Sequence, residues 1–449
     1  MKNAIIYHHH KIAWEKIAFS IFGALFLLSA LSGCAENQRK EAIPASMSIE
    51  GYALTQSVIL SRHNIRSPLS EKGSLLDRMT PYSWHEWSSS ASELTLKGGV
   101  LETQIGQYFR EYLENEGLFP ANYQPSQGEV RIYANAKQRT IATSNYFSSG
   151  LLPSFPAQIE VHAPYDTMDP IFFPRLTFVS SSYAEASIAQ IKEMFQKNIN
   201  GLEDNYQLLS DVVDLRESKA YQSKEVGDFR TDDLSISLSQ GKEPSMTGSL
   251  KNACSLSDAL VLQYYEESDA KKAGFGRELS FQQWKDIAEI KDVYGDVLFS
   301  APLVSVNVAH PLLQTIADEL HNEGRKFTYL CGHDSNISSV LASLDVEDYV
   351  LPSTLEKTPI GSKVVFNSFI NDEGENFYGV YLVYQTTDQL RNLSMLDLDH
   401  PPMAVPLSFK GLHANKDGLY PSDELLNRFE TSIASYDEII SKYGNKLAE

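Results

Sequence analysis

Two short apolar segments, far apart in the sequence, each lead directly into a cluster of charged side chains. Residues 55–61 (TQSVILS) contain the apolar run VIL, and residues 327–331 (FTYLC) are mostly apolar. Both segments are rich in β-branched or aromatic residues, which is typical of strands buried on both faces of a sheet. They are followed by RHNIRSP and GHDSN. Ligands of open α/β sheets bind beyond the carboxyl ends of the strands. The pattern therefore predicts an α/β fold with a ligand site where these two strands end.

The segments around these strands have the periodicity that the layers of such a fold require. Apolar residues recur at helical spacing between residues 101 and 112, and Gly117 follows as a signal for the helix end. A second amphipathic helix is expected directly after GHDSN. We also expect a strand over residues 129–134, a helix over 138–147, a helix over 311–323 that begins at Pro311, and a hairpin of strands over 363–369 and 377–385.

The middle of the chain has a different pattern. Helical segments follow one another from about residue 166 to residue 299 without convincing strands between them. The polar stretch 217–249 among them is expected to be a mobile loop or a short hairpin. The sequence therefore predicts a mainly helical cap domain at 166–299, inserted into an α/β domain formed by 51–165 and 300–449.

The N-terminus has the features of an export signal. Lysines precede an apolar run at 17–31, which is too short for a comfortable transmembrane helix and ends in LSGC, a sequence that resembles a bacterial lipobox. We expect 1–33 to be a lipoprotein signal peptide, Cys34 to carry the lipid and 34–50 to form a flexible tether. The alternatives are an ordinary signal peptide and a short membrane anchor with an incidental cysteine. Ala35 after the cysteine favours the outer membrane, so the expected location is the bacterial cell envelope, either periplasmic or at the outer membrane.

Composition argues against several classes of protein. Asp and Glu number 58 and Lys and Arg number 38, for a net charge of −20, which is the opposite of what a nucleic-acid-binding surface needs. Nucleic acid is therefore not an expected partner. The three cysteines, Cys34, Cys254 and Cys331, are too few for a disulfide scaffold or a multi-cysteine zinc module.

The charged residues at the strand ends suit an anion. They are Arg62, His63 and Arg66 after the first strand, His333 and Asp334 after the later strand, and Arg139 in the first turn of the helix after a third strand. Guanidinium groups match phosphate oxygens in geometry, and helix N-termini add backbone donors. The expected ligand is a phosphate group.

A histidine in such a site can act as a nucleophile, because the arginines disperse the charge of the phosphoryl group as it passes from oxygen to nitrogen. His63 is the candidate nucleophile. Asp334 is the candidate acid, which would protonate the leaving alkoxide and later deprotonate the attacking water. Because arginines can neutralise the charge, and no clustered set of carboxylate and histidine ligands is evident outside the leader, we expect neither a metal ion nor another cofactor.

These residues also resemble a known family. Residues 62–68 (RHNIRSP) resemble the R-H-G-x-R-x-P signature of the histidine acid phosphatases, and residues 332–336 (GHDSN) resemble the downstream H-D motif of that family. The resemblance covers nearly the whole chain after Ile49. It implies a phosphoglycerate mutase-like α/β domain with a helical cap, and hydrolysis of phosphomonoesters through a phosphohistidine. The roles it implies are phosphate binding for Arg62, Arg66, Arg139 and His333, nucleophilic attack for His63 and proton donation for Asp334.

Departures from the signature resemble one branch of that family. Asn64 replaces the usual Gly, and Leu69 follows the proline where phytases commonly carry Thr; both resemble the periplasmic glucose-1-phosphatase branch, as do LTLKGGVLE, TMDPIFFP and TPIGSKVVF. The branch implies a hexose 1-phosphate as substrate, and Glu243 as a residue at the pocket entrance that limits substrate size. The alternative for Glu243 is a solvated loop carboxylate. Relatives carry several disulfides, whereas we expect Cys254 and Cys331 to be two buried thiols or at most one pair.

Three alternatives remain open. A phytase acting on inositol hexakisphosphate would be favoured by a basic pocket rim, and the acidic net charge disfavours it. A phosphoglycerate mutase-like transferase should lack the helical insertion and the proton donor of the H-D motif. A surface lipoprotein that binds sugar phosphate without turnover would need the arginines but neither His63 nor Asp334. The expected partners are a small phosphorylated sugar or an inositol phosphate, and a membrane reached through the lipid anchor; a homodimer is left open.

Overall fold

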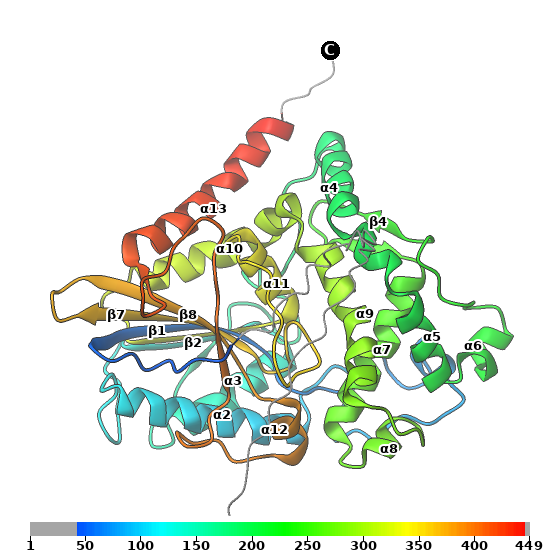
Figure 1. Ribbon diagram of the computed structural model, residues 1–449, viewed down its shortest axis with the longest axis horizontal. Coiled ribbons are helices and arrows are strands. Elements are labelled where there is room, and N and C mark those ends of the chain that lie inside the picture. The colour runs from blue at the N-terminus through cyan, green and yellow to red at the C-terminus, as the bar shows by residue number, and fades with distance from the viewer. Residues whose placement is uncertain (1–42, 445–449) are drawn as a thin grey trace, which may run out of the picture. The chain divides into compact units, whose positions relative to one another are not determined.

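A mixed sheet of eight strands forms the core of the computed structural model, which describes residues 43–444 (Figure 1). The strand order is β10 (Tyr420–Pro421), β8 (Asn376–Tyr384), β7 (Lys363–Asn371), β1 (Tyr52–Arg62), β6 (Phe327–Gly332), β2 (Val130–Ala134) and β3 (Ile159–Glu160), and β9 (Met403–Pro406) pairs with β8. Strands β1, β6, β2 and β3 are parallel, whereas β7 to β10 pair in antiparallel fashion. The predicted α/β fold and the predicted hairpin of β7 and β8 are confirmed.

The parallel strands β1, β6 and β2 end at the same level of the sheet. Arg62 of β1 lies opposite Gly332 of β6, and Ala134 of β2 lies opposite Cys331. Side chains that follow these strands therefore meet at one edge, although long stretches of chain separate them in sequence.

Helices cover both faces of the sheet. On one face lie α2 (Leu96–Asn115) and α3 (Gln138–Leu151), and on the other lie α10 (Pro302–Leu320), α11 (Asp334–Ser343) and α13 (Ser422–Gly444) (Figure 1). Strand β1 serves both cores, because Val58 and Leu60 pack with α10 and α11 while Ile59 packs with α2 and α3. Successive side chains of a strand point to opposite faces, so burial of both faces requires the continuous apolar run seen in the sequence.

The segment between β3 and α10 is mainly helical and supplies most of a third apolar core, to which neighbouring elements also contribute. It contains α4 (Ser181–Asn200), α5 (Glu203–Val212), the 3₁₀ helix η1 (Leu215–Glu217), α6 (Lys219–Gln222), β4 (Ser235–Ser237), β5 (Ser245–Thr247), α7 (Ser249–Glu266), α8 (Ala270–Ala273) and α9 (Phe281–Phe299). The polar stretch 217–249 thus includes a short hairpin, β4 with β5. The described residues belong to one compact unit, so the division into two domains stays a prediction. Two short helices, α1 (Leu75–Arg78) and α12 (Thr387–Asn392), lie in connecting segments of the chain.

One predicted helix start is wrong. The helix expected to begin at Pro311 begins at Pro302, and Pro311 lies inside it. Both prolines give the same start signal, since proline is favoured in the first turn of a helix. The first turns of α10 bury Val304 and Val308 in the core of the helical segment. We attribute the longer helix to this burial, which outweighs the backbone hydrogen bond that Pro311 cannot donate.

Glycines let α2 and α3 pack backbone against backbone. A Cβ atom on Gly106 of α2 would overlap the carbonyl oxygen of Phe147, and one on Gly150 of α3 would overlap that of Thr103. Only glycine fits at both positions without a shift of one helix. The close packing holds α3, with Arg139 in its first turn, beside the strand ends.

Cys254 and Cys331 are buried free thiols, in agreement with the first of the two expectations for them. The predicted signal peptide and Cys34 lie outside the described residues. Within residues 43–444 no single helix is long and apolar enough to span a membrane, and α9 and α10 pass that test only together, as a pair bent by 83°.

Candidate active site

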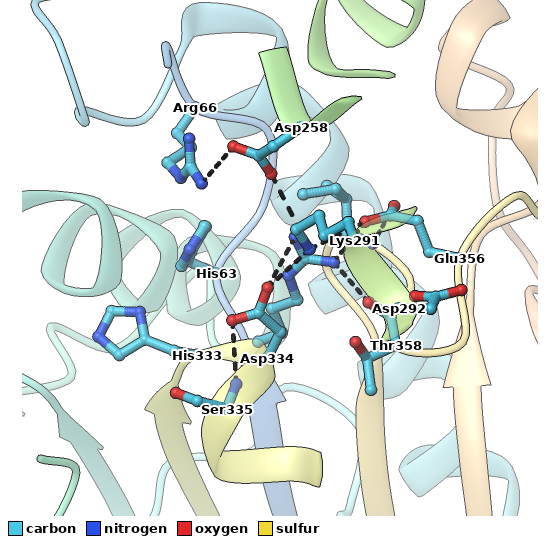
Figure 2. A network of polar contacts seen from close by, with 12 residues as sticks. His63, Arg66, Asp258, Lys291, Asp292, His333, Asp334, Ser335, Glu356 and Thr358 are labelled. Atoms are coloured by element: carbon cyan, nitrogen blue, oxygen red, sulfur yellow. Dashed lines mark hydrogen bonds and ion pairs between the residues drawn. The ribbon is translucent and has the colours of Figure 1, made fainter. Parts of the chain in front are cut away.

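A cavity of about 460 Å³ opens at the edge where β1, β2 and β6 end. Its volume is typical of a small-molecule site. Five of the six residues predicted to bind or transfer phosphate line it, namely His63, Arg66, Arg139, His333 and Asp334. The sixth, Arg62, is fully buried behind the cavity wall, and its Nη2 lies 3.4 Å from Asp334 Oδ2. The tertiary structure therefore brings all six together (Figure 2 labels four of them).

The backbone of the next residue orients the ring of His63. Its Nδ1 lies 2.9 Å from the carbonyl oxygen of Asn64, and because a carbonyl oxygen only accepts, Nδ1 must carry the proton. The main chain of His63 is also fixed, since its N–H donates to Gly332 (3.1 Å) and its carbonyl oxygen accepts from Gly361 (3.1 Å). The lone pair of the ring is therefore on Nε2, and no described residue hydrogen-bonds to that atom.

His333 offers an N–H donor beside the lone pair of His63. Asn135 Oδ1 accepts from the backbone N–H groups of Ala136 and Asp169, both at 2.8 Å, so Asn135 Nδ2 must be the atom that lies 2.6 Å from His333 Nε2. An amide nitrogen only donates, so the proton of the His333 ring is on Nδ1. The ring centroids of His63 and His333 are 5.4 Å apart. The pair thus offers one lone pair and one N–H donor side by side.

Arginine N–H groups without hydrogen-bond partners lie in the cavity wall and directly behind it. Four buried atoms, Nε and Nη2 of Arg62, Nε of Arg66 and Nε of Arg139, have no hydrogen-bond partner among the described residues. Elsewhere these side chains are anchored, because Arg62 Nη1 donates to Glu356 and Arg66 Nη2 donates to Asp258, both at 2.9 Å. A buried donor left unsatisfied costs about 1–3 kcal/mol, and more on a charged group. Bound oxyanions remove that cost, so the cluster suits a phosphate.

Asp334 lies in an ion-pair network that the sequence did not predict (Figure 2). Its Oδ2 lies 2.7 Å from Nζ of Lys291, a residue of α9, and its Oδ1 accepts from the backbone N–H of Ser335 at 2.9 Å. Lys291 Nζ also lies 3.5 Å from Glu356 Oε1. Burial by itself would raise the pKa of Asp334, but the charges of Lys291 and Arg62 outweigh it and hold that pKa well below its usual range.

Burial and the charge of Arg139 favour the neutral form of both histidines. Burial, and next the charge of Arg139, hold the pKa of His63 well below 6.5, and the same two causes lower the pKa of His333. Burial and the neighbouring Arg66 lower the pKa of Arg139 to about 10, so Arg139 stays charged at neutral and acid pH. A neutral imidazole is the form that can act as a nucleophile.

Several carboxyl groups line the cavity beyond the arginines. Glu243 lies exposed in the turn between β4 and β5 and contributes to the cavity lining, and the surrounding protein, followed by the charge of Asp334, raises its pKa. The half-buried carboxyl of Asp292 has a pKa raised to about 8, first by desolvation and then by Glu356. Asp296 also lines this part and is paired with Lys357 at 2.7 Å.

A second buried network supports the main chain of His63 from behind. Asn64 Nδ2 donates to Glu102 Oε2 at 2.8 Å, and Lys363 Nζ and Tyr329 Oη each lie 2.8 Å from Glu102 Oε1. The side chains of Glu102 and Lys363 are completely buried. Because the carbonyl oxygen of Asn64 holds His63 Nδ1, this network fixes the ring of His63 through the backbone.

Sequence reasoning missed the partners that the helical segment and a long loop supply. Lys291 comes from α9, Asp258 from α7 and Glu356 from the loop before β7. The sequence contained one signal, because Asp258 interrupts the apolar run LSDALVL of a predicted helix. In the structure the side chain of Asp258 is 13% exposed. A charged residue in such a run is rarely buried unless it is paired. Lys291 and Glu356 carry no comparable local signal.

The described residues contain no group of three or more His, Cys, Asp or Glu side chains placed to hold a metal ion. The cationic side chains that line the cavity include Arg66, Arg139 and Lys291, and Arg62 lies behind its wall.

Comparisons with known proteins agree with this geometry. A family model described as the histidine phosphatase superfamily (branch 2) matches residues 53–385. The chain is 34% identical over 420 residues to a glucose-1-phosphatase of Salmonella typhimurium, covering 93% of this chain and 98% of that protein. It is 27% identical over 381 residues to the phytase AppA of Escherichia coli, covering 80% and 87%.

Solved structures include a similar fold. A phytase of Hafnia alvei in complex with myo-inositol hexakis sulphate superposes with a TM-score of 0.77 at 26% identity, covering 87% of this chain and 98% of that one.

Proposed function

Because the chain belongs to branch 2 of the histidine phosphatase superfamily and is a phosphoric monoester hydrolase, we propose that it hydrolyses a hexose 1-phosphate through a phosphohistidine formed on His63. One observation carries this proposal. The Nε2 lone pair of His63 and the unpartnered N–H donors of Arg62, Arg66 and Arg139 belong to one cluster at one cavity. A nucleophile among donors that match phosphate oxygens is the arrangement that phosphoryl transfer to nitrogen requires.

The reaction has two steps. His63 Nε2 forms a bond to phosphorus while the bond from phosphorus to the ester oxygen breaks, and the arginines stabilise the charge on the remaining phosphoryl oxygens. The leaving alkoxide takes the proton of Asp334. In the second step the Asp334 carboxylate takes a proton from water, the water oxygen bonds to phosphorus, and the phosphorus–nitrogen bond breaks. Throughout, Nδ1 of His63 keeps its proton and donates it in a hydrogen bond to the carbonyl oxygen of Asn64, which stabilises the positively charged ring of the intermediate.

The cavity beyond the arginines supports a small substrate with a single phosphate. Glu243, Asp292 and Asp296 contribute to that part of the lining, of which Asp292 is neutral below its raised pKa of about 8. Two lysines also contribute, Lys357, which is paired with Asp296, and Lys251, which is exposed. Carboxyl groups accept hydrogen bonds from sugar hydroxyls, but in their ionised form they repel additional phosphate groups. The glucose-1-phosphatase relatives support the same choice. In this proposal Glu243 limits the size of the substrate at the entrance.

Inositol hexakisphosphate is the second candidate substrate, supported by the phytase relatives. A substrate with six phosphates would need cations around the rim to balance its charge. The rim carboxylates count against it. The helical segment and Asp334 count against a phosphoglycerate mutase-like transferase, and the presence of both His63 and Asp334 in the cavity counts against a lipoprotein that binds sugar phosphate without turnover.

The proposed function is tested by kcat/KM of the protein without its predicted signal peptide and lipid anchor, measured on glucose 1-phosphate and on inositol hexakisphosphate. We expect a clear preference for glucose 1-phosphate and its loss in His63→Ala. Residual activity of His63→Ala within about tenfold of the wild type would contradict the nucleophile assignment, since loss of the nucleophile should cost far more. A preference for the inositol phosphate would place the protein with the phytases, and tight binding without turnover would favour the binding lipoprotein.

We further propose that the protein acts in the bacterial cell envelope, anchored through a lipid on Cys34. The proposal rests on the short apolar run and the LSGC sequence that follows it. Cys34→Ser should leave the protein without incorporated fatty acid and release it from the membrane fraction. Equal membrane retention of both forms would contradict it. Sedimentation of the unlipidated protein decides whether two copies form a homodimer.

A further inference from the structure

The residue expected to donate a proton is held in its ionised form. Asp334 Oδ2 lies 2.7 Å from Lys291 Nζ and 3.4 Å from Arg62 Nη2, so two cations share one carboxylate oxygen (Figure 2). An acid that has already lost its proton cannot protonate an alkoxide. Either another group supplies the proton, or Asp334 takes one up before the ester bond breaks.

The charged groups around Asp334 favour uptake of a proton when a phosphate group binds. The groups that act on it or lie beside its partners are Arg62 of β1, His63 and Arg66 of the loop after it, Arg139 of α3, Glu243 of the β4–β5 turn, Asp258 of α7, Lys291 and Asp292 of α9, His333 after β6, and Glu356 of the loop before β7. The pKa values of both histidines lie well below 6.5 and that of Asp292 is raised to about 8, so at mildly acid pH the histidines are neutral and Asp292 is protonated. Apart from Glu243 at the rim, the charged groups that remain are four cations and three carboxylates. The cations are Arg62, Arg66, Arg139 and Lys291, and the carboxylates are Asp258, Asp334 and Glu356.

Binding of a phosphate dianion changes the net charge of this cluster from positive to negative. The cluster carries one net positive charge when its three carboxylates are ionised. A phosphomonoester above its second pKa of about 6 is a dianion and brings two negative charges and no proton of its own. The dianion also competes with Asp334 for Arg62 Nη2, which is buried and has no hydrogen-bond partner among the described residues. A carboxylate that gains an anionic neighbour and shares one of its cations binds a proton more tightly.

Asp334 is the carboxylate placed to accept that proton. Asp258 has its own partner in Arg66, and Glu356 has its own in Arg62 Nη1, both at 2.9 Å. Glu356 is 2% exposed as a side chain, whereas Asp334 is 35% exposed and lines the cavity with His63. Solvent protons can therefore reach Asp334, beside the bond that breaks.

We propose that Lys291 is a positioning residue that couples substrate binding to the protonation of Asp334. Lys291 holds Asp334 ionised and oriented until a phosphate dianion binds, and Asp334 then takes up one proton from solvent. That proton passes to the ester oxygen when the phosphorus–oxygen bond breaks, so the product alcohol carries the proton taken up on binding. The inference rests on the proposed role of Asp334 as the acid.

The test measures protons taken up when sulfate binds. Sulfate is a dianion that does not itself titrate near pH 5, so any proton taken up belongs to the protein. Isothermal titration calorimetry in buffers of different ionisation enthalpy gives the number of protons per bound sulfate. For the wild type we expect a value close to one at pH 5. Sulfate binding by the wild type without proton uptake would overturn the proposal, and this measurement needs no variant to fold.

Variants then identify the residues responsible. Asp334→Asn should bind sulfate with no proton uptake. Lys291→Met should take up clearly less than the wild type, because without the lysine Asp334 is already partly protonated before sulfate binds. Lys357→Met is the matched control, since it removes the same charge from the same cavity but from a lysine paired with Asp296. Its uptake should equal that of the wild type. Unchanged uptake in Lys291→Met, or an equal reduction in both lysine variants, would refute the role of Lys291.

Kinetics separate this inference from the proposed function. Lys291→Met should change the pH dependence of glucose 1-phosphate hydrolysis much more than that of p-nitrophenyl phosphate, whose leaving group needs no proton. If His63→Ala is inactive and Asp334→Asn is selectively slow on the sugar phosphate, the proposed function holds even where Lys291→Met behaves like the wild type. Active His63→Ala would instead remove the premise of both proposals.

Discussion

Replacing Lys363 by methionine tests whether the buried network behind His63 holds the site together. Lys363 Nζ donates to Glu102 (2.8 Å), Gly361 (2.9 Å) and Ser61 (3.2 Å), and both charged side chains are fully buried. Methionine fills a similar volume but leaves the Glu102 carboxylate buried without its cation. Breaking a buried pair in this way costs about 3–5 kcal/mol, so we expect the free energy of unfolding to fall by that amount.

A second substitution shows whether the charge is the cause. In Lys363→Met combined with Glu102→Gln no charge is left in this buried network, and the amide oxygen of the new glutamine can still accept from Tyr329. The remaining cost is that of imperfectly satisfied hydrogen bonds, about 1–3 kcal/mol. The double variant should therefore be more stable than Lys363→Met alone.

The assay is urea unfolding at pH 7, followed by both tryptophan fluorescence and circular dichroism. Lys326→Met is the control, because Lys326 makes a partly exposed pair with Glu129 (2.9 Å) just before β6. Such a pair is worth about 0–1 kcal/mol. A loss of less than about 1 kcal/mol in Lys363→Met would refute the reasoning, because a buried carboxylate without its cation should cost more. So would a double variant less stable than the single one.

Three further results are expected. Asp334→Asn should slow hydrolysis of a sugar phosphate far more than that of p-nitrophenyl phosphate, and equal losses in kcat on the two substrates would argue against the acid role. Arg139→Met removes the charge that lowers the pKa of His63 most, so the pKa of His63 should rise. Because the neutral ring is the reactive form, the acidic limb of kcat/KM against pH should move to higher pH. A limb that does not move would contradict this. Gly106→Ala places a methyl group against the carbonyl oxygen of Phe147 and should lower the free energy of unfolding by about 1–3 kcal/mol in the same urea assay, where an unchanged value would show that α2 and α3 can separate freely.

Local signals in the sequence were sufficient for the parts of the fold that depend on neighbouring residues. The β-branched run at 55–61 lies within β1, and the alternating segments at 363–369 and 377–385 form β7 and β8. Strand periodicity and turn residues act over a few positions, so they can be recognised without knowing the rest of the chain. The helix start at Pro302 could not be recognised in this way, because burial of the first turns of α10, rather than a local signal, distinguishes Pro302 from Pro311.

Some features of the candidate site also followed from local sequence signals, and others depended on tertiary packing. The sequence by itself determined which side chains follow the buried strands, and so the presence of His63, Asp334 and the arginines at one edge of a sheet. Only the tertiary structure decided that Lys291 of α9 pairs with Asp334, and that Asn135 orients His333. The strength of an ion pair, and with it the charge of a carboxyl group, depends on distances of a few ångströms and on burial. Those quantities are set when segments far apart in the chain pack together, and no local pattern of residues contains them.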